Sequence, residues 1–100
     1  MNFVWDPDKS ASNIIKHDGV SFDEAIETFY DDHAIEEFDE ANSSDVEKRF
    51  IRIALSTRRL LVVVFIDLTI DVAGEATYRL ISARRAERDE QKLYEEFNQA

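Results

Sequence analysis

The residues best suited to chemistry lie between Tyr78 and Arg85, where three arginines and a serine occur within eight positions. An arginine guanidinium is planar, stays charged and can donate to two phosphate oxygens at once. Arg79, Arg84 and Arg85, together with the hydroxyl group of Ser82, therefore predict a site that recognises phosphate. The segment is typical of a strand that runs directly into a helix. In a regular strand, Arg79 and Arg84 would point to opposite faces of the sheet, unless Arg84 is re-aimed where the strand gives way to the helix.

Two further pairs of residues could take part in the same chemistry. Lys16 and His17 end a predicted helix, where they could bind phosphate and transfer a proton. A favourable interaction with the helix dipole is the simpler explanation for both. Glu47 lies two residues before Arg49 and could act as a general base beside it, although an exposed loop carboxylate is the simpler explanation.

The arginines also have structural explanations. Arg49 and Arg79 could pair with some of the chain's 22 acidic residues, and Arg84 and Arg85 could be solvated charges at the start of a helix. A cation at a helix start is electrostatically unfavourable, which favours a functional role for Arg84 and Arg85.

The acidic part of the chain offers little support for a metal site. Residues 18–47 hold 12 acidic residues and no lysine or arginine, and they include Asp31-Asp32-His33 and Glu36-Glu37. Neighbouring residues of a strand point apart, and this spacing imposes no coordination geometry on a divalent cation. We therefore expect no metal and no other cofactor. These residues are explained as a solvated acidic surface or as a surface for a basic partner.

Length and composition indicate one globular domain over residues 1–100. The chain is 44% hydrophobic and 11% aromatic, it has no cysteine, and its net charge is −10. The first residues lack the basic and apolar regions of a signal peptide, and the longest apolar run, 60–66, is too short to cross a bilayer. We expect a cytoplasmic protein with no membrane partner.

The helices that must position these residues have clear start signals. Asp6 and Pro7 begin the first helix, which ends near Gly19 and should bury Ala11, Ile14 and Ile15. Ser21 and Glu24 form the capping box of a second helix, whose apolar residues recur at helical spacing as far as Tyr30. A last helix over 87–98 should bury Leu93, Tyr94 and Phe97.

The strands follow from alternating or continuous apolar residues. A short strand opens the chain at 3–5, and four more are expected at 34–38, 48–56, 60–66 and 76–83. In the second of these four, Ile51, Ile53 and Leu55 should face the core while Arg52 faces away. The predicted fold class is α+β, with the order β-α-α-β-β-β-β-α. It has a small antiparallel β-sheet, two N-terminal helices and one C-terminal helix.

The run 60–66 is apolar throughout, which predicts a central strand covered on both faces. The chain's own helices would cover one face. We therefore expect a partner or a second copy to cover the other face, and poor solubility of the chain on its own.

Several motifs in combination resemble the BrnT toxin family, a branch of the RelE-like ribonuclease toxins of type II toxin–antitoxin systems. They run in order over nearly the whole chain: Phe3-x-Trp5-Asp6-Pro7-x-Lys9, Asn13-x-x-Lys16-His17, Gly19-Val20-Ser21-Phe22-x-Glu24-Ala25, Glu47-x-Arg49-Phe50, Leu61-Val62-Val63-Val64 and Arg79-x-Ile81-Ser82-Ala83-Arg84-x-Ala86.

The resemblance implies a RelE-like fold and a metal-independent endoribonuclease that cleaves RNA and so inhibits translation. It also implies neutralisation by a BrnA-like antitoxin, a ribbon-helix-helix protein, in a hetero-oligomer. Through that antitoxin the complex would bind operator DNA and repress its own promoter. The acidic segment 18–47 leaves an alternative open, a catalytically inactive toxin-like module that acts only through its partner protein. In the enzyme, the predicted catalytic residues are Arg79, Arg84, His17, Glu47 and Arg49, and the predicted substrate-binding residues are Lys16, Ser82 and Arg85.

Overall fold

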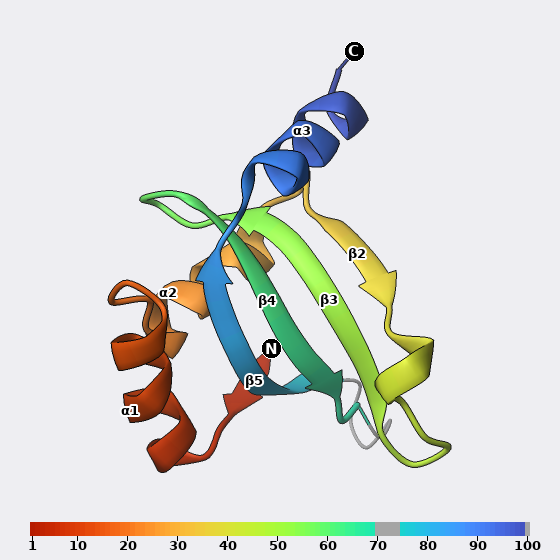
Figure 1. Cartoon of the computed structure of the whole chain (residues 1–100). Coiled ribbons are helices and arrows are strands. Elements are labelled where there is room, and N and C mark those ends of the chain that lie inside the picture. The colour runs from red at the N-terminus through yellow and green to blue at the C-terminus, as the bar shows by residue number, and fades with distance from the viewer. Residues whose placement is uncertain (70–74, 100) are drawn as a thin grey trace.

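The structure, a computed structural model, describes residues 1–69 and 75–99 and has the α+β class predicted from the sequence (Figure 1). One five-stranded sheet is combined with three α-helices, and short 3-10 helices lie at Thr28–Tyr30 and Glu40–Asn42. In chain order the elements are β1 (Asn2–Val4), α1 (Pro7–Lys16), α2 (Phe22–Glu27), β2 (Ile35–Phe38), β3 (Lys48–Leu55), β4 (Leu60–Asp67), β5 (Thr77–Arg85) and α3 (Arg88–Phe97).

The sheet is mixed, and the prediction of an antiparallel sheet was wrong in this respect. Its strand order is β1-β5-β4-β3-β2, and β2 to β5 pair in antiparallel fashion. The short strand β1 lies beside β5 and runs parallel to it. Short connections make consecutive strands antiparallel, but more than 70 residues separate β1 from β5, so no local signal fixed their relative direction.

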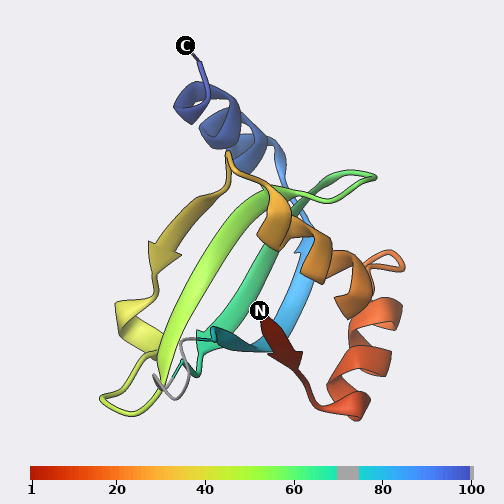
Figure 2. The ribbon, with the colours of Figure 1, turned by 180° about the vertical axis from the view of Figure 1, so that it is seen from behind.

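The core lies between the sheet and α2, which crosses the face of the sheet seen in Figure 2. Phe22 and Ala25 of α2 pack against the alternate residues of β4 that point to this face. The aromatic rings of Phe3, Phe29 and Tyr78 extend the core along its margin. The β4 residues of the core are Leu61, Val63 and Phe65.

Strand β3 faces the opposite way from the prediction. Phe50 stacks on Phe65 with ring centroids 5.6 Å apart, so it points toward the core. The Arg52 guanidinium lies 4.9 Å from the Phe29 ring centroid, and its Nε donates to the Thr28 carbonyl at 3.1 Å. Arg52 therefore points toward the 3-10 helix that follows α2, and Ile51 and its alternate neighbours point away. Both faces of β3 carry apolar residues, so alternation alone could not identify the core face.

The second face of the sheet, opposite α2, is turned toward the viewer in Figure 1, with α3 at one end. Val62 and Ile66 lie on this face and are only 3% and 2% exposed within the single chain. Arg49 and Arg79 pair with Ile66 from either side, and the stems of such side chains can cover apolar surface. Leu60 and Val64 of the same face are only half-buried, so the expectation that a partner covers this face of β4 stays a prediction.

The outer helices bury less apolar surface than predicted. In α1 only Asn13 is buried, whereas Ile15 is 85% exposed. In α3 Leu93 and Phe97 are exposed, and only Tyr94 is half-buried. Burial, and a hydrogen bond of 2.7 Å to Asp31, raise the pKa of Tyr94 to about 12. Within the described residues, no helix has the length and apolar character needed to cross a membrane.

Candidate functional site

A β-bulge in β5 brings Arg79 and Arg84 to the same face of the sheet. Val64 of β4 pairs with Ser82, whereas the next residue, Phe65, pairs with Leu80, so Ile81 has no partner on β4. An extra residue of this kind reverses the alternation beyond it. Arg79 consequently pairs with Ile66 and Arg84 with Val62, both on the second face. The prediction that the two arginines point to opposite faces assumed a regular strand and was wrong.

The first group of predicted site residues lies at one end of this face. Arg49 and Arg79 flank Ile66 from its two neighbouring strands. A Glu47 carboxylate oxygen is 3.7 Å from Nη1 of Arg79, so Glu47 pairs with Arg79 and not with Arg49. Nε of Arg49 is buried and has no hydrogen-bond partner among the described residues. Two guanidiniums on either side of the apolar residue Ile66 can bind an anion such as phosphate.

The second group lies where the end of α1 meets β5. Lys16 and His17 line a hollow of about 460 Å³ together with Ser82. The same two residues line an adjoining hollow of about 310 Å³ together with Arg84 and Arg85. The structure thus brings together an imidazole, a hydroxyl group and three cations from opposite ends of the sequence.

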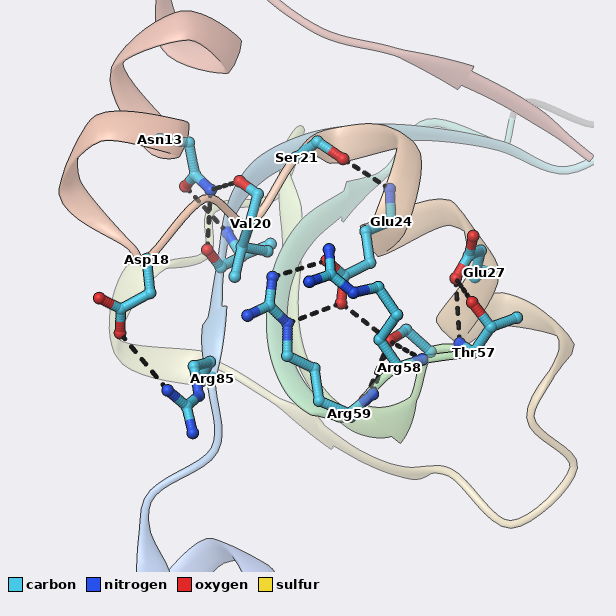
Figure 3. A network of polar contacts seen from close by, with 12 residues as sticks. Asn13, Asp18, Val20, Ser21, Glu24, Glu27, Thr57, Arg58, Arg59 and Arg85 are labelled. Carbon is cyan, nitrogen blue, oxygen red and sulfur yellow. Dashed lines mark hydrogen bonds and ion pairs between the residues drawn. The ribbon is translucent and has the colours of Figure 1, made fainter.

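Asn13 holds α1 against β5, and sequence reasoning did not include it among the site residues. Its side-chain amide donates to the Ala83 carbonyl at 2.8 Å, and its Oδ1 accepts from the Ala83 N–H at 3.1 Å. It also donates to the Val20 carbonyl at 2.9 Å (Figure 3). Strand β1 pairs with β5 only as far as Arg79, so this amide replaces the missing neighbour strand at Ala83. The available signal was a polar residue with poor helix propensity inside a predicted helix.

Arg84 and Arg85 already have carboxylate partners. Arg84 donates to both carboxylate oxygens of Glu90, at 2.8 and 2.7 Å. This pair raises the pKa of Arg84 and lowers the pKa of Glu90. Arg85 lies 4.0 Å from a carboxylate oxygen of Asp18, an exposed and weak pair (Figure 3). A phosphate bound by Arg84 must therefore displace Glu90 or share the guanidinium with it.

A separate ion-pair network has a structural role. Nearly buried Glu24 accepts from two nitrogens of Arg59, at 2.9 and 2.8 Å, and from the Ser56 hydroxyl (Figure 3). The hydrogen bond to Arg59 lowers the pKa of Glu24. Glu24 therefore joins the turn between β3 and β4 to α2. The Ser21 hydroxyl caps the Glu24 N–H as predicted, but the carboxylate does not close the capping box.

The acidic segment contributes structural contacts. Asp31 accepts from the Leu55 N–H at 2.8 Å and from the Tyr94 hydroxyl at 2.7 Å, and it thereby attaches α3 to the sheet. Among residues 1–69 and 75–99, no three histidine, aspartate or glutamate side chains gather as ligands for a metal ion.

The predicted site residues therefore form two separate groups, which lie at different positions along β5. Arg79 and Arg84 pair with β4 residues four positions apart, so they are separated by roughly 13 Å along the strand. This spacing suits two different phosphates of one nucleic-acid chain better than a single phosphate. The first group is Glu47, Arg49 and Arg79, and the second is Lys16, His17, Ser82, Arg84 and Arg85.

Comparison with known proteins identifies the family of the chain. A family model described as "Ribonuclease toxin, BrnT, of type II toxin-antitoxin system" matches residues 5–90. This range contains all eight predicted site residues. A search of curated proteins finds no match to the chain.

Proposed function

Because the chain belongs to the BrnT family of ribonuclease toxins of type II toxin–antitoxin systems, we propose that it is a metal-independent endoribonuclease with a RelE-like fold. The observation that carries this proposal is the arrangement of cations along β5. The bulge turns Arg79 and Arg84 to one face, and Asn13 holds α1 so that Lys16 and His17 lie beside Arg84. An RNA strand carries a phosphate at every step, which a row of cations can neutralise.

The reaction is an internal attack of the ribose 2′-hydroxyl on the adjacent phosphate. A base takes the hydroxyl proton, the 2′-oxygen bonds to phosphorus, and the bond from phosphorus to the 5′-oxygen breaks. An acid gives a proton to that 5′-oxygen. The products are a cyclic phosphate and a 5′-hydroxyl group. Cations stabilise the charge that develops on the phosphate oxygens in the transition state.

The two groups of residues divide these tasks. His17 transfers a proton at the phosphate held by Lys16, Ser82 and Arg84, because an imidazole can both accept and donate one. Arg79 holds a second phosphate. Glu47, Arg49 and Arg85 complete the set. Glu47 is the alternative proton-transfer candidate, for a reaction at the phosphate beside Arg79, and Arg49 and Arg85 are further phosphate ligands.

We further propose that cleavage inhibits translation in the cytoplasm and that a BrnA-like antitoxin with a ribbon-helix-helix part neutralises the toxin. Family membership supports an antitoxin partner in general. Residues 18–47, with 12 acidic residues and no lysine or arginine, provide a surface that favours a basic partner segment. The hetero-oligomer of toxin and antitoxin would bind operator DNA through the antitoxin and repress its own promoter.

One observation favours the alternative function, an inactive toxin-like module that acts only through its partner. Arg79, Arg84 and Arg85 each lie beside a carboxylate of the same chain. No RNA cleavage at micromolar protein, together with tight binding to the product of a neighbouring gene, would select this alternative over the enzyme.

The decisive experiment for the enzyme compares Arg79→Ala with Arg58→Ala in a cleavage assay with purified protein and RNA. Among the residues that the structure describes, the Arg79 guanidinium makes only a long, exposed ion pair, so its removal should leave the fold intact. We expect kcat/KM to fall about tenfold, because the loss of one charge-assisted contact to the second phosphate weakens RNA binding by about 1.5 kcal/mol. Arg58 is an exposed arginine outside both groups, and its variant should cleave like the wild type. Equal activity of the two variants would contradict the assignment of Arg79.

A further inference from the structure

The hollow beside Lys16 and His17 continues toward Trp5, a residue that the proposed reaction does not use. A neighbouring hollow of about 590 Å³ is lined by Trp5, Lys9 and Arg79, among others. Lys9 and Ile81 line this hollow and also the hollow that contains Ser82. The three hollows therefore adjoin one another along α1 and β5, and we call them together the groove. It runs from Trp5 and Arg79 at one end to Arg84 at the other.

The lining of the groove is less acidic than the protein as a whole. Four acidic residues line the three hollows against five cations, whereas the whole chain has a net charge of −10. The carboxylate of Asp6, at the Trp5 end, accepts from the Asp8 N–H at 2.9 Å and caps α1. The cations, five of the chain's 12 lysines and arginines, are Lys9, Lys16, Arg79, Arg84 and Arg85.

Lys9 is placed to contact a ligand in this groove. It is exposed on α1, at the point where two hollows meet. Among the described residues its ammonium group makes no ion pair and no hydrogen bond, in contrast to Arg84 with its carboxylate partner. No change in the protein's own contacts is therefore needed before Lys9 can bind a phosphate.

Trp5 is the aromatic side chain that lines the groove beside Lys9 and Arg79. It is the only tryptophan of the chain and is half-buried, with its ring edge-to-face against Phe22 at 6.0 Å between centroids. An aromatic side chain beside cations is the usual platform on which an unpaired base stacks.

We propose that the Trp5 end of the groove is a subsite for a nucleotide that flanks the cleaved position of a single-stranded RNA. Lys9 binds its phosphate and Trp5 contacts its base. This inference rests on the proposed ribonuclease function and extends it from one reacting phosphate to a strand that follows β5. Lys9 and Trp5 are positioning residues here, because they touch the RNA away from the reacting atoms.

The test is a fluorescence titration of the full chain with a single-stranded 2′-O-methyl RNA oligonucleotide, which binds but cannot be cleaved. Because Trp5 is the sole tryptophan, a change in its emission reports binding at this end of the groove. We expect quenching on binding. Lys9→Ala should weaken binding about tenfold. It should also make the slope of log K against the logarithm of the salt concentration shallower by about 0.7, the value for one phosphate contact on a single-stranded nucleic acid. Lys92→Ala, which removes an exposed lysine of α3 outside the groove, should bind like the wild type.

The outcomes separate this subsite from the ribonuclease itself. If wild-type protein cleaves RNA but Trp5 emission stays constant and Lys9→Ala binds like the wild type, the subsite is wrong and the enzyme stands. If Trp5 is quenched and Lys9→Ala binds weakly while no RNA is cleaved, the subsite stands and the enzyme is wrong. Equal weakening by Lys9→Ala and Lys92→Ala overturns the subsite, because it would show a general effect of net charge.

Discussion

The guanidinium of Arg84 is held in place by a carboxylate that also competes with its proposed ligand. Its guanidinium donates to Glu90 through two hydrogen bonds, and Glu90 also accepts from the Glu87 N–H at the start of α3. The pair fixes the guanidinium at the groove before any RNA arrives. The same carboxylate competes with the phosphate that Arg84 is proposed to bind.

At this scale we predict that Glu90→Gln binds RNA more tightly than the wild type. Glutamine can still cap the helix, but it no longer competes as an anion for Arg84. Because a partly exposed ion pair contributes up to about 1 kcal/mol, its loss should raise affinity for the 2′-O-methyl oligonucleotide roughly fivefold. Glu95→Gln is the matched control, since it removes the same charge from an exposed position of α3. Equal affinities of the two variants would exclude Arg84 as a phosphate ligand.

The elements are joined by side chains that act across the folded structure. Asn13 attaches α1 to the free part of β5, and Glu24 attaches α2 to the turn after β3 through Arg59. Asp31 attaches α3 to the end of β3 through Tyr94 and the Leu55 N–H. Each is a polar side chain that satisfies groups on a distant element, which explains why the outer helices need little apolar burial.

At the scale of elements, the Glu24–Arg59 contact predicts a pH dependence. The pKa of Glu24 is lowered from its ordinary value of 4.5 by the hydrogen bond from Arg59. A carboxyl with a lowered folded pKa contributes stability above its unfolded pKa, and this contribution is lost as the pH falls through the folded value. Glu24→Gln should therefore lower the free energy of unfolding by about 2 kcal/mol at pH 7. The difference from wild type should shrink as the pH falls below about 4.5.

Urea unfolding of both proteins between pH 3 and pH 7 measures this difference. Glu37→Gln, on the exposed edge strand β2, serves as a control for the loss of one negative charge. A difference between wild type and Glu24→Gln that stays constant over this pH range would show that the ion pair is not its source.

The whole molecule has one core that draws on distant parts of the chain. Phe22 near the N-terminus packs with Phe65 of β4 and Leu80 of β5, and Trp5 packs on Phe22. Removal of any one of these elements would expose the others. We therefore propose that residues 1–100 form one domain.

At this scale we predict a single cooperative unfolding transition in urea. Trp5 emission follows the junction of β1 and α1, whereas far-UV circular dichroism follows the sheet and helices together. The two curves should coincide, with a slope of about 1 kcal/mol per molar urea. An earlier transition in Trp5 emission would show that this corner unfolds on its own, and would contradict a single domain.

Local patterns were sufficient for much of the fold. Asp6 with Pro7 and Ser21 with Glu24 each identified a helix start correctly, and the apolar run 60–66 identified the central strand. The orientation of β3 and the apolar face of α1 were not predictable in this way. Both depend on which apolar face finds a partner, and that is decided by the packing of other elements.

The sequence by itself determined the residue types of the candidate site: the arginines of β5, the pair Lys16 and His17, and Glu47 with Arg49. Their chemistry toward phosphate follows from their side chains alone. Only the tertiary structure decided which of them meet. A bulge at Ile81 turned Arg79 and Arg84 to one face, and the Asn13 amide brought α1 to the edge of β5. The bulge depends on how β4 pairs with β5, and the Asn13 contacts join a side chain to the backbone of a residue 70 positions away, so no local pattern of residue types can report them.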